Sequence, residues 1–96
     1  MSSEQLGGWS PWKEAGANEI DICKKVKAEV EAKTRRKFPV FQPLDYRSQI
    51  VNGTNYEIQV YVGNNQCAAL TVHVAHQKEP QLGKVVLFSL PGVDFF

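Results

Sequence analysis

The spacing of hydrophobic residues changes once along the chain, from a helical period to an alternating one. Residues 18–34 contain no proline or glycine, and their apolar positions recur at the spacing of one helix face: Ile22, Cys23, Val26 and Val30. This pattern predicts an amphipathic helix that is capped by Asn18. The opposite, solvated face is predicted to carry Lys24, Lys27 and Glu31.

From residue 38 to residue 50 the period is two, as in a strand with one face on a core. The residues predicted to share one face are Phe38, Val40, Gln42, Leu44, Tyr46, Ser48 and Ile50. Pro39 and Pro43 indicate an edge or irregular start, because proline donates no hydrogen bond to a neighbouring strand. Asn52-Gly53 then predicts a two-residue type I′ turn, since Asn and Gly adopt positive φ most easily.

Three further strands are predicted after this turn. Residues 56–62 alternate, and the inner face of this strand is Tyr56, Ile58, Val60 and Val62. Residues 63–66 signal a turn, and the next strand, residues 70–74, has as its inner face Leu70, Val72 and Val74. Residues 75–83 predict a connection, and residues 84–90 a last, nearly continuous apolar strand.

One helix followed by strands with short turns predicts an α+β roll, in which a four- to five-stranded antiparallel sheet wraps around one N-terminal amphipathic helix. The length of 96 residues suits a single domain, 1–96.

Residues 1–15 are predicted to form a flexible arm, because glycine and proline interrupt it. The arm also carries Leu6, Trp9 and Trp12. Either the tryptophans pack back on the domain, or Leu6 and its neighbours remain free to bind in a pocket of a partner protein.

The charge of the chain is balanced, with a formal net charge of +1. This balance argues against a nucleic acid or an acidic membrane as partner, since both need a basic excess on one face. The basic residues at the end of the predicted helix are interpreted as a solvated helix terminus: Lys33, Arg35, Arg36 and Lys37.

No signal-peptide pattern is visible at the N-terminus, which favours a cytoplasmic protein with Cys23 and Cys67 as free thiols.

Cys67, His73 and His76 are the only candidates for a thiol–imidazole pair or a metal site. Residues three apart on a strand face opposite sides, so surface histidines and a small buried thiol are the preferred interpretation. There is no glycine-rich phosphate loop after a strand and no nucleophile elbow. We therefore expect no catalytic residues, no metal and no cofactor.

The segment Gln49-Ile50-Val51-Asn52-Gly53 fits the Gln-x-Val-x-Gly motif of the cystatins, and a longer likeness surrounds it. Gly7-Gly8 resembles the N-terminal glycine pair of the stefins, the intracellular branch of that family. Residues 25–34 resemble the stefin helix, and residues 37–41 resemble the start of the strand after it. Residues 48–56 are the most similar segment. Over about residues 6–74, the chain thus resembles the stefins of the cystatin superfamily, which are cysteine protease inhibitors.

The resemblance implies a cystatin-like roll and a reversible, tight-binding competitive inhibitor of papain-like (cathepsin-type) cysteine proteases. The implied inhibitory surface is a wedge of three parts: the arm, the first hairpin tip and a second hairpin loop. The residues that it assigns to protease binding are Leu6, Gly7, Gly8, Gln49, Ile50, Val51, Asn52, Gly53, Ala75, His76 and Gln77. Leu6 is implied to occupy a substrate subsite, while the glycines bend the chain over the catalytic cysteine.

The chain departs from the stefin pattern in the second loop, where the family usually has Leu-Pro. Residues 74–80 contain no such pair, so we expect faster dissociation from a protease with an unchanged mode of binding. A rival interpretation is a protein-binding module of the same fold with little or no protease inhibition. A long hairpin also suits domain swapping, so we expect an active monomer and a swapped dimer as its alternative state.

Overall fold

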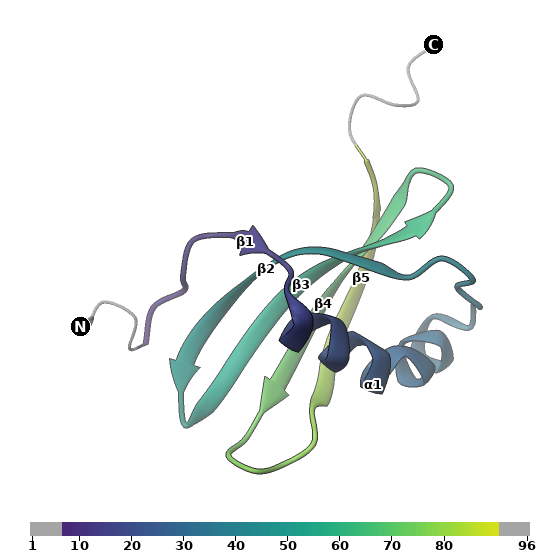
Figure 1. Ribbon diagram of the computed structural model, residues 1–96. Helices are drawn as coiled ribbons and strands as arrows, with labels where there is room; N and C mark the ends of the chain where they lie inside the picture. The colour runs from purple at the N-terminus through teal and green to yellow at the C-terminus, as the bar shows by residue number, and fades with distance from the viewer. Residues whose placement is uncertain (1–6, 91–96) are drawn as a thin grey trace.

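The computed structural model describes residues 7–90, in which one helix lies across one face of a five-stranded antiparallel sheet (Figure 1). The elements in chain order are β1 Lys13–Glu14, α1 Ala17–Thr34, β2 Gln42–Val51, β3 Gly53–Gly63, β4 Gln66–Val74 and β5 Gln81–Ser89. Each strand pairs with its neighbour in sequence. The predicted α+β roll, with one helix against an antiparallel sheet, is confirmed. The two residues of β1 were not predicted, because so short a strand has no period.

The core lies between α1 and the inner face of the central strands. The predicted helix stripe from Ile22 to Val30 is buried, as are the predicted inner residues of β3 from Ile58 onward. The residues that make up the core cluster are Ile22, Cys23, Val26, Val30, Phe38, Ile58, Val60, Val62, Ala68, Leu70 and Val72. Burial of this apolar area is the main force that holds the helix on the sheet. Within residues 7–90 no helix has the length and apolarity that a membrane span requires.

The N-cap of α1 is Gly16, so the prediction of Asn18 was wrong. The Glu19 carboxylate reaches back to accept a hydrogen bond of 2.9 Å from the Gly16 backbone N–H. Asn18 instead donates a hydrogen bond of 3.1 Å to the hydroxyl of Tyr56 on β3. The side chain that the sequence offered as a cap therefore ties the helix to the sheet.

The solvated face predicted for the helix is only partly correct. Glu31 is half-buried, because its carboxylate accepts a hydrogen bond of 2.8 Å from the backbone N–H of Phe38. Lys37 also lies 3.8 Å from the other oxygen of this carboxylate. These contacts turn the chain after α1 and bring Phe38 into the core.

Strand β2 begins at Gln42, later than predicted, and a bulge interrupts it between Pro43 and Asp45. The bulge shifts the faces of the strand, so Leu44 is exposed while Tyr46 packs against the core. Val40 precedes the strand and is exposed as well. The prediction that one face runs unbroken from residue 38 to residue 50 was wrong, because it assumed a strand without an extra residue.

The two consecutive residues with positive φ that were predicted for the first turn occur in the second turn instead. In the first turn only Gly53 has a positive φ, of 93°, and Ile50 pairs with Thr54. A type I′ turn needs two residues with positive φ, so that prediction for Asn52-Gly53 was wrong. In the second turn Asn64 and Asn65 both have positive φ, of 55° and 59°.

Strands β4 and β5 begin earlier than predicted, at Gln66 and Gln81. The earlier start of β4 adds Cys67 to the sheet, where it pairs with Tyr61 on β3. Cys67 and Cys23 are both buried, free thiols, as predicted.

Candidate functional site

Three segments that are far apart in the sequence meet at one end of the sheet. They are the start of the described arm at Gly7, the first tip (residues 49–53) and the second loop (residues 75–80) between β4 and β5 (Figure 1). The β3–β4 turn at Asn64 and Asn65 lies at the opposite end. Leu6, the remaining predicted site residue, lies outside the described residues.

The described arm, residues 7–15, runs along the outer edge of β2. The backbone N–H of Gly7 donates a hydrogen bond of 2.9 Å to the carbonyl oxygen of Ile50, in the first tip. Further along, Ser10 N–H donates to the Ser48 carbonyl at 2.7 Å, and Ser48 N–H donates to the Ser10 hydroxyl at 3.0 Å. Ser10 is buried by this contact. The arm therefore continues the edge formed by β1 along β2 as irregular backbone, as far as Gly7.

Both tryptophans of the arm pack back on the domain, the first of the two outcomes expected for them. The guanidinium of Arg47 on β2 lies 4.9 Å from the Trp9 ring centroid and 5.1 Å from the Trp12 ring centroid. Arg47 is fixed in turn by Glu57 on β3, with an N–O distance of 2.8 Å. Cation–π contacts thus hold the arm against β2 by side chains as well as by backbone.

The first tip and the second loop are in direct contact at Gly53. A Cβ atom at this position would lie 2.7 Å from the carbonyl oxygen of Val74 and 3.0 Å from the Cα of Ala75. Only glycine permits this approach, and the φ of 93° at Gly53 also favours glycine. The second loop turns through Gln77, whose φ is 58°, and Lys78 N–H donates to the Ala75 carbonyl at 3.1 Å.

The side chains at the end of the wedge are accessible. Ile50 and Val51 are 46% and 40% exposed, and Asn52 is exposed between them and Gly53. In the second loop His76 and Gln77 are exposed and Ala75 is half-buried. The structure therefore brings together every predicted site residue that it describes.

Two residues next to the wedge were missed by the sequence prediction, and they link its parts. His73 Nδ1 lies 2.6 Å from Asn55 Oδ1, and Asn55 Nδ2 donates to Gln49 Oε1 at 3.0 Å. Gln49 Nε2 then donates to the carbonyl oxygen of Gly7 at 2.9 Å. Only the register of three strands brings these residues side by side, so no spacing in the sequence could have indicated them.

The buried thiols lack the properties of a nucleophile. Burial, and after it the negative charge of Asp45, raises the pKa of the Cys67 thiol. A reactive cysteine needs the opposite shift, because the thiolate is the reactive form. His73 is engaged with Asn55. In the described part of the chain no group of three metal-ligating side chains is present.

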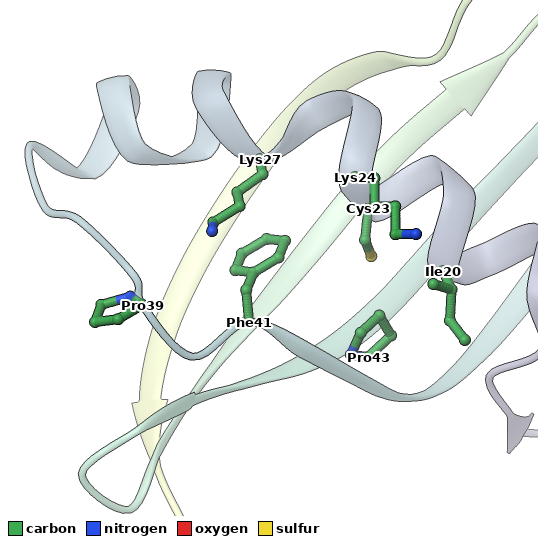
Figure 2. A pocket seen from close by; sticks show the side chains of 7 residues that line it. All are labelled: Ile20, Cys23, Lys24, Lys27, Pro39, Phe41 and Pro43. Atoms are coloured by element: carbon green, nitrogen blue, oxygen red, sulfur yellow. The ribbon is translucent and has the colours of Figure 1, made fainter.

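A hollow of about 210 Å³ lies between α1 and the chain that leads into β2 (Figure 2). Its lining consists of Ile20, Cys23, Lys24, Lys27, Pro39, Phe41 and Pro43. The Cys23 side chain points from the helix towards Phe41 and Pro43 (Figure 2). Burial, together with the nearby Glu19 carboxylate, raises the pKa of Cys23 to about 12, so this thiol stays protonated at neutral pH. The hollow is separate from the three segments of the wedge.

Comparison with known proteins gives the same family as the motif. A family model described as Cystatin domain matches residues 7–89. The chain is 38% identical to leukocyte cysteine proteinase inhibitor 1 of Sus scrofa over 84 residues, which cover 83% of this chain and 82% of that protein.

Two further relatives carry cystatin and stefin names. Stefin-C of Bos taurus is 37% identical over 82 residues, which cover 83% of this chain and 81% of the relative. Cystatin-B of Macaca fuscata fuscata is 40% identical over 68 residues, which cover 69% of each chain.

Proposed function

Because this chain belongs to the cystatin family of cysteine protease inhibitors, we propose that it inhibits papain-like, cathepsin-type proteases by occluding their active-site cleft. The proposed inhibition is tight-binding. It is competitive because the wedge occupies the cleft that the substrate needs, and it is reversible because the wedge offers no group that forms a covalent bond. The observation that carries this proposal is the meeting of Gly7, the first tip and the second loop at one end of the sheet.

The first tip forms the centre of the wedge. Ile50 and Val51 are exposed apolar side chains at the end of a rigid hairpin, so their burial in a cleft removes apolar area from water. The hairpin is fixed by its contact with Val74 and Ala75, so little conformational entropy remains to be lost on binding. Asn52 lies between the two strands, so its peptide groups are available to hydrogen-bond to the cleft.

The arm supplies the second part of the wedge. The start of the arm lies along the substrate subsites of the protease. Leu6 takes the place of a substrate side chain, and Gly7 and Gly8 follow it. The φ of 81° at Gly7 is a conformation that L residues rarely adopt, and it turns the chain near the tip. A backbone bent in this way presents no peptide bond to the catalytic cysteine in a geometry that can be cleaved.

The second loop supplies the third and weakest part. Ala75, His76 and Gln77 contact the protease without the Leu-Pro pair that stefins usually have. Loss of an apolar anchor of this kind raises the dissociation rate more than it lowers the association rate. The protein therefore leaves its target faster than a stefin with that pair.

The test is the inhibition constant for papain of the full chain and of three variants. Gly7→Arg, deletion of residues 1–8 and Val51→Asp are each expected to raise the inhibition constant at least tenfold. Val40→Asp is the matched control, because Val40 is as exposed as Val51 (42% against 40%) and lies beside Gly63, at the other end of β3. Unchanged constants for both the arm and the tip variants would contradict the wedge.

A second candidate function is a protein-binding module with the same fold and little or no protease inhibition. The observation that favours it is the unusual second loop, residues 75–80. The same measurement separates the two candidates, since a module of this kind inhibits papain little or not at all, even at a large molar excess. We also propose a cytoplasmic location, because two buried unpaired thiols suit a reducing compartment.

A further inference from the structure

The hydrogen-bonded row of His73, Asn55 and Gln49 crosses the face of the sheet that is turned away from α1. Gln49 is directly opposite Asn55, and Asn55 is directly opposite His73. Tyr56 and Val72, one position along, pack against the core, so the row itself lies on the other face. The row ends at the carbonyl oxygen of Gly7.

All hydrogen bonds of the row run in one direction. The Gly7 carbonyl can only accept, so the Gln49 atom that contacts it is the donor Nε2, and Gln49 Oε1 faces Asn55. Asn55 must then donate through Nδ2, which leaves its Oδ1 as the acceptor for His73. His73 therefore carries a proton on Nδ1. Each member is oriented by the one before it, and the last orients the arm.

We propose that His73 and Asn55 are positioning residues for inhibition, which act through Gln49 to hold the Gly7 segment of the arm beside the first tip. This inference rests on the proposed function, because it concerns how the same wedge is assembled. The row fixes the Gly7 carbonyl, while the Gly7 N–H is fixed by the Ile50 carbonyl. Ordering the arm before binding lowers the entropy that the complex must lose.

His73 has a second contact that reaches the other parts of the wedge. A Cβ atom at Gly53 would lie 3.2 Å from Cε1 of the His73 ring, so the ring packs beside the first tip. His73 also lies two residues before Ala75, where the second loop begins. The His73 side chain therefore lies beside the first tip and close to the second loop, and it orients the arm through the hydrogen-bonded row.

The variants that test this proposal change one link each. His73→Phe keeps an aromatic ring beside Gly53 and removes the donor. Asn55→Asp keeps the size of the side chain and the acceptor for His73, but its carboxylate cannot donate to Gln49. His73→Asn is the conservative variant, since Asn Nδ2 takes the place of His Nδ1. Thr71→Val is the matched control, because Thr71 lies two residues from His73 on the same face of β4.

The first measurement follows the arm in the free, full-length protein by amide hydrogen exchange. We expect the Gly7 amide to exchange several times faster in His73→Phe and Asn55→Asp, and at the original rate in His73→Asn and Thr71→Val. Equal Gly7 exchange in all proteins would overturn the proposal. This measurement needs no protease, so it decides on the row even if the protein inhibits nothing.

The second measurement is the inhibition constant for papain. We expect His73→Phe and Asn55→Asp each to raise it about fivefold, the ratio that about 1 kcal/mol of net hydrogen-bond energy gives. The double variant is expected to cost no more than either single change, because both break the same row. Independent, additive effects, or no rescue by His73→Asn, would contradict a role through the arm. If wild-type protein inhibits papain while His73→Phe is unaffected, this proposal fails and the proposed function stands.

Discussion

At the scale of single residues, Gly53 decides how the first tip meets the second loop. We predict that Gly53→Ala raises the inhibition constant for papain at least tenfold and lowers the melting temperature. The added Cβ would lie 2.7 Å from the Val74 carbonyl oxygen, at a φ that alanine tolerates poorly, so the tip must shift. Gly16→Ala is the control, because a Cβ there meets the Glu19 carboxylate at an ordinary 3.5 Å. Equal inhibition by both variants would mean that the contact does not shape the tip.

A second residue-scale prediction concerns the alkaline stability of the fold. Burial raises the pKa of Cys23 from 9.0 to about 12, so above pH 9 the unfolded chain loses this proton while the folded chain keeps it. The free energy of unfolding must therefore fall as pH rises from 9 towards 12, by up to about 1.4 kcal/mol per pH unit. Urea denaturation at several pH values measures this slope. Cys23→Ala is expected to reduce it, and an identical slope in the variant would show that Cys23 is not its cause.

The sequence predicted residues well where one period covers a whole element, and poorly where a side chain has a partner far away in the chain. The helix stripe from Ile22 to Val30 needed only the helical period. Asn18 was assigned to a cap, although its partner is Tyr56 on β3. His73 was left as a surface histidine for the same reason, because Asn55 is brought opposite it only by strand pairing.

At the scale of elements, the bulge in β2 leaves an unusual carboxyl group. Asp45 has one buried oxygen, Oδ1, without a hydrogen-bond partner in the described residues, and burial raises the pKa of its carboxyl. A raised pKa means that the ionised form is less favourable in the folded than in the unfolded chain. Asp45 therefore costs stability at neutral pH, and this cost disappears as pH falls below about 3.8.

We predict that Asp45→Asn stabilises the protein at pH 7 by about 1 kcal/mol, which raises the melting temperature by about 4 to 8 °C. The gain is expected to vanish near pH 3, where Asp45 is protonated in both states. Thermal denaturation at the two pH values measures the difference. Asp21→Asn, on the exposed face of α1, is expected to give no such gain. A variant that is less stable than wild type at pH 7 would contradict this interpretation.

The elements themselves were predicted in type and order, and the errors lie in their details. Alternation predicted β3 correctly because this strand keeps the same inner face from Tyr56 to Val60. It failed in β2, since a bulge changes the period and depends on the pairing with β3. Asn52-Gly53 suggested a type I′ turn, but Val51 pairs with Gly53, so only Asn52 lies between the two strands.

At the scale of the whole molecule, the wedge exists only if the first hairpin folds back on itself. In a domain-swapped dimer the first tip would open and β2 and β3 would continue into a neighbour's sheet, so residues 49–53 would no longer project. We predict that any dimer separated by size-exclusion chromatography fails to inhibit papain, whereas the monomer inhibits it. A dimer as potent as the monomer would show that the first tip is not needed.

The central claim, that this protein occludes the cleft of papain-like proteases, is tested most directly by titrating active papain with the purified monomer. The account predicts that activity falls in proportion to added protein until one equivalent is present, and that it returns when the complex is diluted or when excess substrate is added. Papain that keeps its full activity at a large molar excess of the protein would contradict the account.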